Sequence, residues 1–222
     1  METIAERPLE RQEILKPLFE KNQPLRVRYA AGELIAQIGS YVAGLHLILS
    51  GAVHDALPAS PWSARDTALL GPGDLVGIEC LERPSDGMAR TMCRAIAPTR
   101  LLFIERQAVA RAMETDAQFR DCLTRYLAHR CFTARRNALW SQAPHDVRLA
   151  HVLRQLGSLC GEPTADGRIR LPECITMRTL NEIAAMTGRQ SRAARKKIGG
   201  MTEDETGIAF HAGTVEPVDA SV

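Results

Sequence analysis

The sequence predicts an α+β protein with an N-terminal β-roll, a long helix after it and a C-terminal winged helix-turn-helix. Three observations indicate this order. Glycines and short β-type runs alternate between residues 25 and 105, residues 116–141 contain neither Gly nor Pro, and a basic segment follows a turn glycine near the C-terminus. We therefore expect domains at residues 1–106, 107–143 and 144–222.

The composition is that of a globular protein. Of the 222 residues, 45% are apolar and 24% are charged, and the net charge is only +2. No apolar run reaches the roughly 18 to 20 residues that span a bilayer, and the first residues lack a signal pattern. We expect a cytoplasmic protein with no membrane partner. None of the six cysteines forms a Cys-x-x-Cys pair, so the sequence predicts free thiols and no metal site.

The N-terminal part reads as one helix followed by short strands. Residues 10–22 carry apolar side chains on one side, as an amphipathic helix does. β-type runs then follow at residues 45–49, 68–70, 75–76 and 101–104. Many short strands with turn signals at close spacing favour a sandwich or roll.

The long helix carries a narrow apolar stripe. Its members recur at steps of three or four and are Leu123, Leu127, Cys131, Ala134 and Ala138. Such a stripe is typical of a seam between two helices, here in a homodimer, because small residues let two backbones approach closely. The alternative is that the helix packs on its own roll.

The C-terminal part predicts two short helices joined by a turn. A helix is expected at residues 147–159 and a strand at 168–171. Thr179 and Glu182 then form a capping-box pattern, and Gly188 stands where a turn needs a left-handed backbone. Residues 207–215 read as a hairpin, and a helix-turn-helix followed by a hairpin is the winged variety.

The second of these helices is strongly basic. Between residues 189 and 197 there are five cations and no acid, although three acids follow at 203–205. A basic helix presented by a partner helix fits the major groove of double-stranded DNA. The alternative is an ordinary basic surface helix. The predicted DNA-binding residues are Thr179, Arg189, Gln190, Ser191, Arg192, Arg195, Lys196 and Lys197.

Read end to end, the chain resembles the CRP/FNR family of bacterial transcription regulators. The resemblance rests on four segments of the predicted roll, of which the third is most like the FNR branch: Gly32-Glu-Leu-Ile35, Leu45-His-Leu-Ile-Leu-Ser-Gly51, Leu70-Gly-Pro-Gly-Asp-Leu-Val-Gly77 and Arg94-Ala-Ile-Ala-Pro-Thr-Arg-Leu-Leu102. It implies a cyclic-nucleotide-binding-type β-roll and a homodimer on a two-fold symmetric operator. RNA polymerase would be a further partner of an activator.

Residues of the second helix depart from the family pattern. Gly188 falls on the family's turn glycine, and Lys196 falls on an arginine that contacts DNA. The recognition positions that usually read Ser-Arg-Glu here read Gln190, Ser191 and Arg192. The resemblance therefore implies a different operator, or a family member regulated by redox or protein contacts with weak or lost DNA binding.

The effector and cofactor stay open. By resemblance, the effector-binding residues are Gly77, Glu79, Arg90 and Thr91, but the glutamate is displaced by one residue from the family's Gly-Glu pair. A cyclic nucleotide and haem are both candidates, and neither has a complete motif.

A redox switch and an enzyme are the remaining alternatives. Cys80 and Cys93, close to the predicted pocket, could act as redox switches only if they were accessible thiolates. The chain has no His-x-His, Gly-x-Ser-x-Gly or His-Glu-x-x-His pattern, so we do not expect an enzyme.

Overall fold

The computed structural model describes most of the roll and the helices that follow it, but only parts of the C-terminal region. The described residues are 8–57, 67–82, 87–141, 143–164, 169–176, 179–180, 183, 208–211 and 214–217. The predicted recognition helix and its turn, at residues 184–200, lie outside them.

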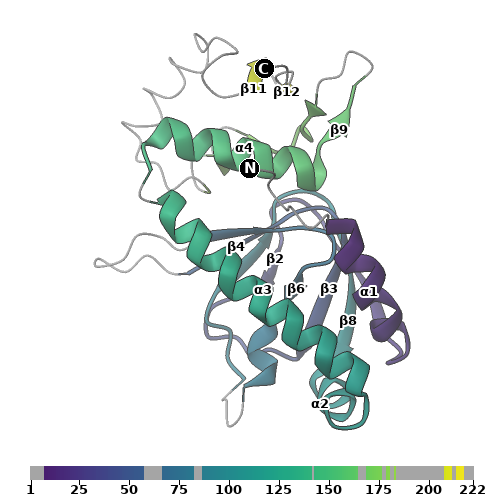
Figure 1. Ribbon diagram of the computed structural model, residues 1–222. Coiled ribbons are helices and arrows are strands. Elements are labelled where there is room, and N and C mark those ends of the chain that lie inside the picture. Colours follow the sequence, from purple (N-terminus) through teal and green to yellow (C-terminus); the bar gives the residue numbers. More distant parts are fainter. Residues whose placement is uncertain are drawn as a thin grey trace.

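Two four-stranded antiparallel sheets form the β-roll, as predicted (Figure 1). The first sheet has the order β1 (Leu25–Tyr29), β8 (Thr99–Glu105), β3 (Gly44–Ser50) and β6 (Leu75–Val76). The second has the order β2 (Leu34–Ala36), β7 (Met92–Ala95), β4 (Val53–Ala56) and β5 (Thr67–Leu70). The strands predicted at 45–49, 68–70, 75–76 and 101–104 are confirmed, and four others join them.

The two sheets pack face to face around a small apolar core. Alternate residues of β3 and β8 point between the sheets, and Ile48 lies opposite Leu101 in the ladder. The second sheet contributes Val53, Leu70 and Cys93 to the same core. The period of two in strands β3 and β8 therefore divides their side chains between this core and the helix-covered face.

Three helices cover the other face of the first sheet. They are α1 (Pro8–Glu20), α2 (Arg106–Thr115) and α3 (Ala117–Ser141), and α3 runs diagonally across the roll in Figure 1. Asp116 separates α2 from α3, because its backbone is extended and its side chain caps α3 by accepting a hydrogen bond from the Phe119 amide at 3.0 Å. Phe119 also meets Phe19 of α1, with ring centroids 6.3 Å apart.

A third apolar cluster joins the roll to the C-terminal part. Helix α4 (His145–Cys160), predicted at 147–159, lies across the top of the roll in Figure 1. Its Leu153 and Leu156 pack with Ala52 and Ile96, which stand in two tight turns of the roll. These residues are almost fully buried, so α4 rests directly on the ends of strands β4 and β7.

The remaining described strands form a small sheet. It has the order β11 (Ile208–His211), β12 (Thr214–Pro217), β10 (Ile169–Arg170) and β9 (Glu162–Pro163). Strands β11 and β12 pair antiparallel with His211 opposite Thr214, which confirms the hairpin expected at residues 207–215.

Thr179, the predicted start of a helix, already lies within one. Its amide donates to the Thr176 hydroxyl at 3.3 Å, and the Leu180 amide donates to the Thr176 carbonyl at 3.0 Å. Thr176 therefore makes the capping contacts that the sequence pattern assigned to Thr179.

No helix within the described ranges combines the length and apolar character needed to cross a membrane.

His46 on β3 gives the folded state a defined pH dependence. Burial lowers the pKa of His46 to about 4, against a hydrogen bond with the Val76 backbone that raises it. The unfolded chain takes up a proton near pH 6.5, whereas the folded chain does so only near pH 4. The stability that neutral His46 provides is therefore complete above about pH 6.5 and is lost as the pH falls toward 4.

We predict that His46→Gln removes this dependence. Between pH 7 and pH 5 the free energy of unfolding of the unchanged protein should fall by about 2 kcal/mol more than that of the variant. Urea unfolding at both pH values measures the difference. Equal falls in the two proteins contradict the assignment to His46.

Candidate functional site

Gly77, the first predicted effector residue, has a backbone role. It precedes the short 3₁₀ helix η1 (Ile78–Leu81) with φ 86° and ψ 28°, a left-handed conformation that only glycine adopts cheaply. A Cβ atom there would lie 2.5 Å from the Gly44 carbonyl oxygen. Close backbone approach and positive φ together explain the glycine.

The structure brings Glu79 and Arg90 together, but the arginine points out of the roll. Glu79 Oε1 accepts a hydrogen bond from the Arg90 backbone amide at 3.3 Å. The Arg90 guanidinium instead pairs with Glu82 at 2.6 Å, and the Arg90 side chain is 64% exposed. It therefore forms a surface ion pair and places no positive charge inside the roll.

Thr91 faces the same side of β7 as Cys93. Its hydroxyl lies 3.7 Å from the Cys93 sulfur, and that thiol donates to Asp55 Oδ1 at 3.5 Å. The hydroxyl, thiol and carboxylate thus form a polar row across β7 and β4. No cation of the predicted effector set faces this row.

Neither cysteine near the site meets the requirements of a redox switch. Cys80 and Cys93 are 7% and 4% exposed. Burial raises the pKa of Cys80 to about 11 and raises that of Cys93 further, helped by the charge of Asp55. Both are neutral thiols at pH 7, so the redox role raised for them from sequence is not supported.

The structure adds two residues that sequence reasoning missed, Asp55 of β4 and Arg130 of α3. Arg130 Nη2 lies 3.3 Å from Asp55 Oδ2, and the two side chains are 19% and 16% exposed. Residues 75 positions apart meet here. No local sequence motif predicts this ion pair. The sequence shows only that Asp55 is an acidic residue in a short β-type segment.

The predicted dimer residues divide into two groups. Leu123 is 1% exposed and belongs to the core of its own chain, and Leu127 packs against that core. The later members Cys131, Ala134 and Ala138 are exposed. Leu123 packs on its own roll, because the first half of α3 lies on the β-roll.

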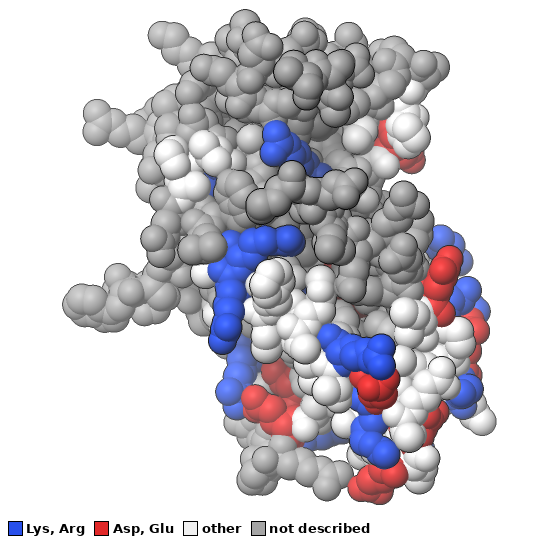
Figure 2. Space-filling model, viewed as in Figure 1, with Lys and Arg blue, Asp and Glu red and all other residues white. Residues whose placement is uncertain are grey.

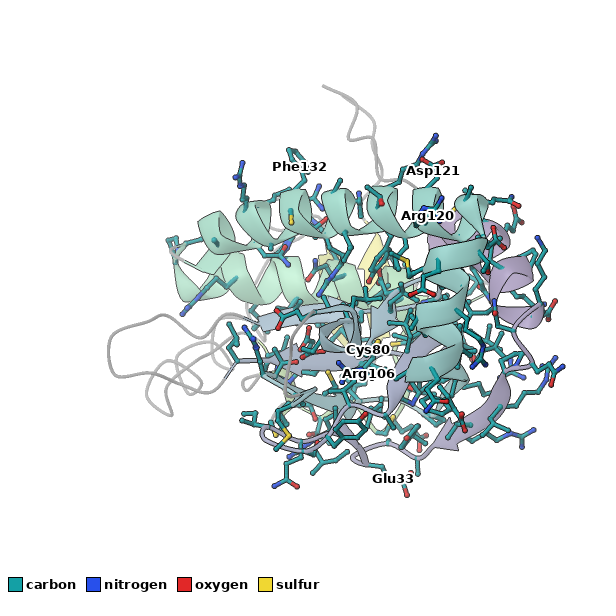
Figure 3. The ribbon with its side chains drawn as sticks, turned by 90° about the horizontal axis from the view of Figure 1, so that it is seen from below. Glu33, Cys80, Arg106, Arg120, Asp121 and Phe132 are labelled. Atoms are coloured by element: carbon teal, nitrogen blue, oxygen red, sulfur yellow. The ribbon has the colours of Figure 1, made fainter. Side chains whose placement is uncertain are left out.

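A large apolar side chain on α3 points away from the roll. Phe132 is 66% exposed, and Figure 3 shows it on the outer side of the helix together with Asp121. The sequence stripe did not include Phe132, because it lies beside the predicted seam and not on it.

Most of the predicted DNA-binding residues lie outside the described part of the chain. Thr179 is described and is half-buried near the start of its helix. The described charge around α3 and α4 is positive. His151 of α4 has a pKa lowered by burial and by the neighbouring charges of Arg136 and Arg154. In Figure 2 a band of blue side chains near the upper end of α3 has no red side chain directly beside it.

Within the residues that the structure describes, no group of three or more His, Cys, Asp or Glu side chains could hold a metal ion. The haem hypothesis stays a prediction.

Comparison with known proteins identifies the roll. Residues 26–116 match the family model of the cyclic nucleotide-binding domain. No curated protein matches the sequence of the chain.

Solved structures of transcription regulators share the fold over nearly the whole chain. The c-di-GMP responsive global regulator CLP of Xanthomonas campestris matches with a TM-score of 0.68 and 14% identity, over 94% of this chain and 99% of that one. FixK2 of Bradyrhizobium japonicum matches with a TM-score of 0.65 and 18% identity, over 90% and 98% of the two chains. A CRP-family transcriptional regulator of Thermus thermophilus matches with a TM-score of 0.66 and 20% identity, over 87% and 92%. The resemblance to CRP/FNR regulators is thus confirmed for the fold.

We predict that Gly77→Ala destabilises the roll by more than a matched glycine substitution does. Gly32 also has a positive φ, of 91°, but a Cβ there would meet nothing within 4 Å. Gly32→Ala should lose about 1 kcal/mol from backbone strain alone, and Gly77→Ala at least about 1 kcal/mol more, because it also meets the Gly44 carbonyl. Urea unfolding measures both losses, and equal losses contradict the backbone role of Gly77.

Proposed function

Starting from a cyclic nucleotide-binding domain at residues 26–116 and the fold of CRP/FNR regulators, we propose that this chain is a DNA-binding transcription regulator. It acts as a homodimer in the cytoplasm and reads a two-fold symmetric operator whose half-sites lie about 34 Å apart. The β-roll ends near residue 106, the dimerisation helix spans 107–143, and residues 144–222 form the winged helix-turn-helix. RNA polymerase is a further partner if the bound dimer activates transcription.

The observation that carries this proposal is the charge of the segment at residues 189–197. It holds five cations and no acid in a chain whose net charge is only +2. In the proposed complex, these cationic side chains contact the phosphates and the base edges of the DNA. Arg192 is suited to guanine, because its guanidinium can donate to O6 and N7 together.

The preceding helices are also rich in positive charge. Between residues 131 and 160 the sequence has four arginines, at 135, 136, 148 and 154, and a single acid, Asp146. Positive charge on α3 and α4 supports an encounter with a polyanion, since such fields steer charged partners.

The dimer seam is best placed on the outer face of α3. Leu123 is committed to its own core, whereas Phe132 exposes 66% of its surface at the end of the helix that extends past the roll. Ala128 is exposed four residues before it, on the same face of the helix. A second copy of α3 would cover this apolar side chain.

We predict that the double variant Arg192→Ala/Lys196→Ala binds duplex DNA at least about tenfold more weakly, because each contact to base or phosphate contributes about 1 kcal/mol or more. Fluorescence anisotropy with a symmetric duplex selected from a random library measures the affinity.

The matched control removes the same charge elsewhere. Lys16→Ala/Lys21→Ala, on α1 and just after it, should bind DNA as the unchanged protein does. If the two double variants bind alike, the helix at 189–197 is not the reader. If the unchanged protein selects no duplex at all, the alternative of a regulator with lost DNA binding holds.

We predict that Phe132→Asp yields monomers, because a carboxylate cannot be buried in an apolar seam without a partner. Sedimentation velocity at micromolar concentration gives the mass. The control is Ile14→Asp on α1, where an apolar side chain is 56% exposed and no seam is proposed. A dimer that survives Phe132→Asp places the seam elsewhere.

A further inference from the structure

The inner face of α3 changes from apolar to polar along its length. Phe119, Leu123, Tyr126 and Arg130 follow one another at steps of four, three and four, so they share one face. The first two are 1% exposed in the core beneath the helix. The last two reach the sheets through polar groups. Apolar packing therefore holds the first half of α3 on the roll, and hydrogen bonds hold it further along.

The Tyr126 hydroxyl accepts a hydrogen bond from the Leu75 amide at 2.8 Å in a buried position. One turn later Arg130 bonds the carboxylate of Asp55. These two contacts tie α3 to β6 of the first sheet and to β4 of the second. Arg130 therefore spans from the helix to the sheet on the far side of the roll.

The carboxylate of Asp55 is used on both oxygens. Oδ2 meets Arg130 at 3.3 Å, and Oδ1 accepts from the Cys93 thiol at 3.5 Å. Cys93 is the direct partner of Asp55 in the β4–β7 ladder. Because each carboxylate oxygen has its own partner, the orientation of the Asp55 carboxylate is fixed. It is therefore a preorganised acceptor for the Arg130 guanidinium.

The charges at this position do not fit a cyclic nucleotide. A cyclic phosphate is an anion and needs a cation that faces it. Arg90, the arginine expected from sequence, is bonded to Glu82 at the surface. Arg130 already has an anion in Asp55, and Glu79 and Asp74 add negative charge close to Cys93 and Arg130. A nucleotide would have to displace Asp55 and leave that largely buried carboxylate without its arginine.

We propose that Arg130 and Asp55 form an internal latch that fastens α3 to the roll, with Asp55 as a built-in anion, so that the roll takes no cyclic nucleotide. The latch does not depend on DNA binding, and it holds in the monomer.

The latch also lies on the strands that carry the C-terminal part. Asp55 is three residues from Ala52, and Cys93 is three residues from Ile96. Ala52 and Ile96 are the turn residues on which α4 rests. A force that moves β4 or β7 at the latch is therefore transmitted over one strand length to the seat of α4.

The test uses the full chain and two pairs of substitutions. The latch variants are Asp55→Asn, Arg130→Met and the double variant. The control variants are Glu82→Gln, Arg90→Met and their double variant, because this pair is also an arginine and a carboxylate but its side chains are 64% and 48% exposed. Hydrogen exchange of the α3 amides and the melting temperature are read for each.

Each latch single variant should speed exchange in the second half of α3 by about tenfold or more and lower the melting temperature by about 5 °C or more, since it leaves one buried charge unpaired. The double variant should keep the faster exchange but regain part of the melting temperature, because it leaves no unpaired charge. The exposed control pair should change neither quantity. Additive losses in the latch pair, or equal losses in both pairs, overturn the latch.

A second measurement tests the ligand independently. Cyclic AMP or cyclic GMP at millimolar concentration should leave the melting temperature of the unchanged protein where it was, because a ligand that binds the folded state raises it. A rise with either nucleotide overturns the exclusion. None of these measurements involves DNA. A failure of the latch proposal can therefore be distinguished from a failure of the DNA-binding proposal.

Discussion

The packing of α3 on the first sheet is the constraint on which the rest of the structure depends. Phe119 and Leu123 close the helix-covered core, and Tyr126 satisfies a buried backbone amide of β6. Without α3, the apolar core that α1, α2, β3 and β8 share would lose part of its cover. Because the same helix must also extend beyond the roll, its two ends face different surroundings, and a single apolar stripe cannot serve both.

The periodicity of apolar residues in the sequence predicted those strands and helices whose position depends only on apolar packing. The strands with strong apolar alternation, at 45–49 and 101–104, and the helix at 116–141, which has neither Gly nor Pro, were confirmed. Strand β4 escaped because its sequence, Val-His-Asp-Ala, carries polar residues toward the interior, where pattern reasoning expects apolar ones. The exception to the apolar pattern is Asp55, which lies between the two sheets because a distant arginine pairs with it.

The spacing of residues along the chain indicated which residues could form the site, but it did not predict the directions of their side chains. Arg90 and Thr91 are adjacent in sequence, yet the arginine leaves the roll and the threonine faces Cys93. Likewise, the stripe proposed on α3 starts in the core and ends in solvent, because only the first half of the helix lies on the roll. Only the three-dimensional position of β4 shows that Arg130 has an acid within reach. The recognition helix remains a prediction from charge and resemblance.

The cluster between the roll and α4 bears on how such a protein can be re-engineered. Ala52 and Ile96 are nearly inaccessible because Leu153 and Leu156 lie over them, and a Cβ at Gly71 would collide with the Leu159 side chain. The roll and α4 therefore meet in a closely packed apolar interface and are not joined by the chain alone. A chimera that grafts another C-terminal domain onto this roll must therefore keep the α4 side chains that fit these turns, or the two parts will not pack together.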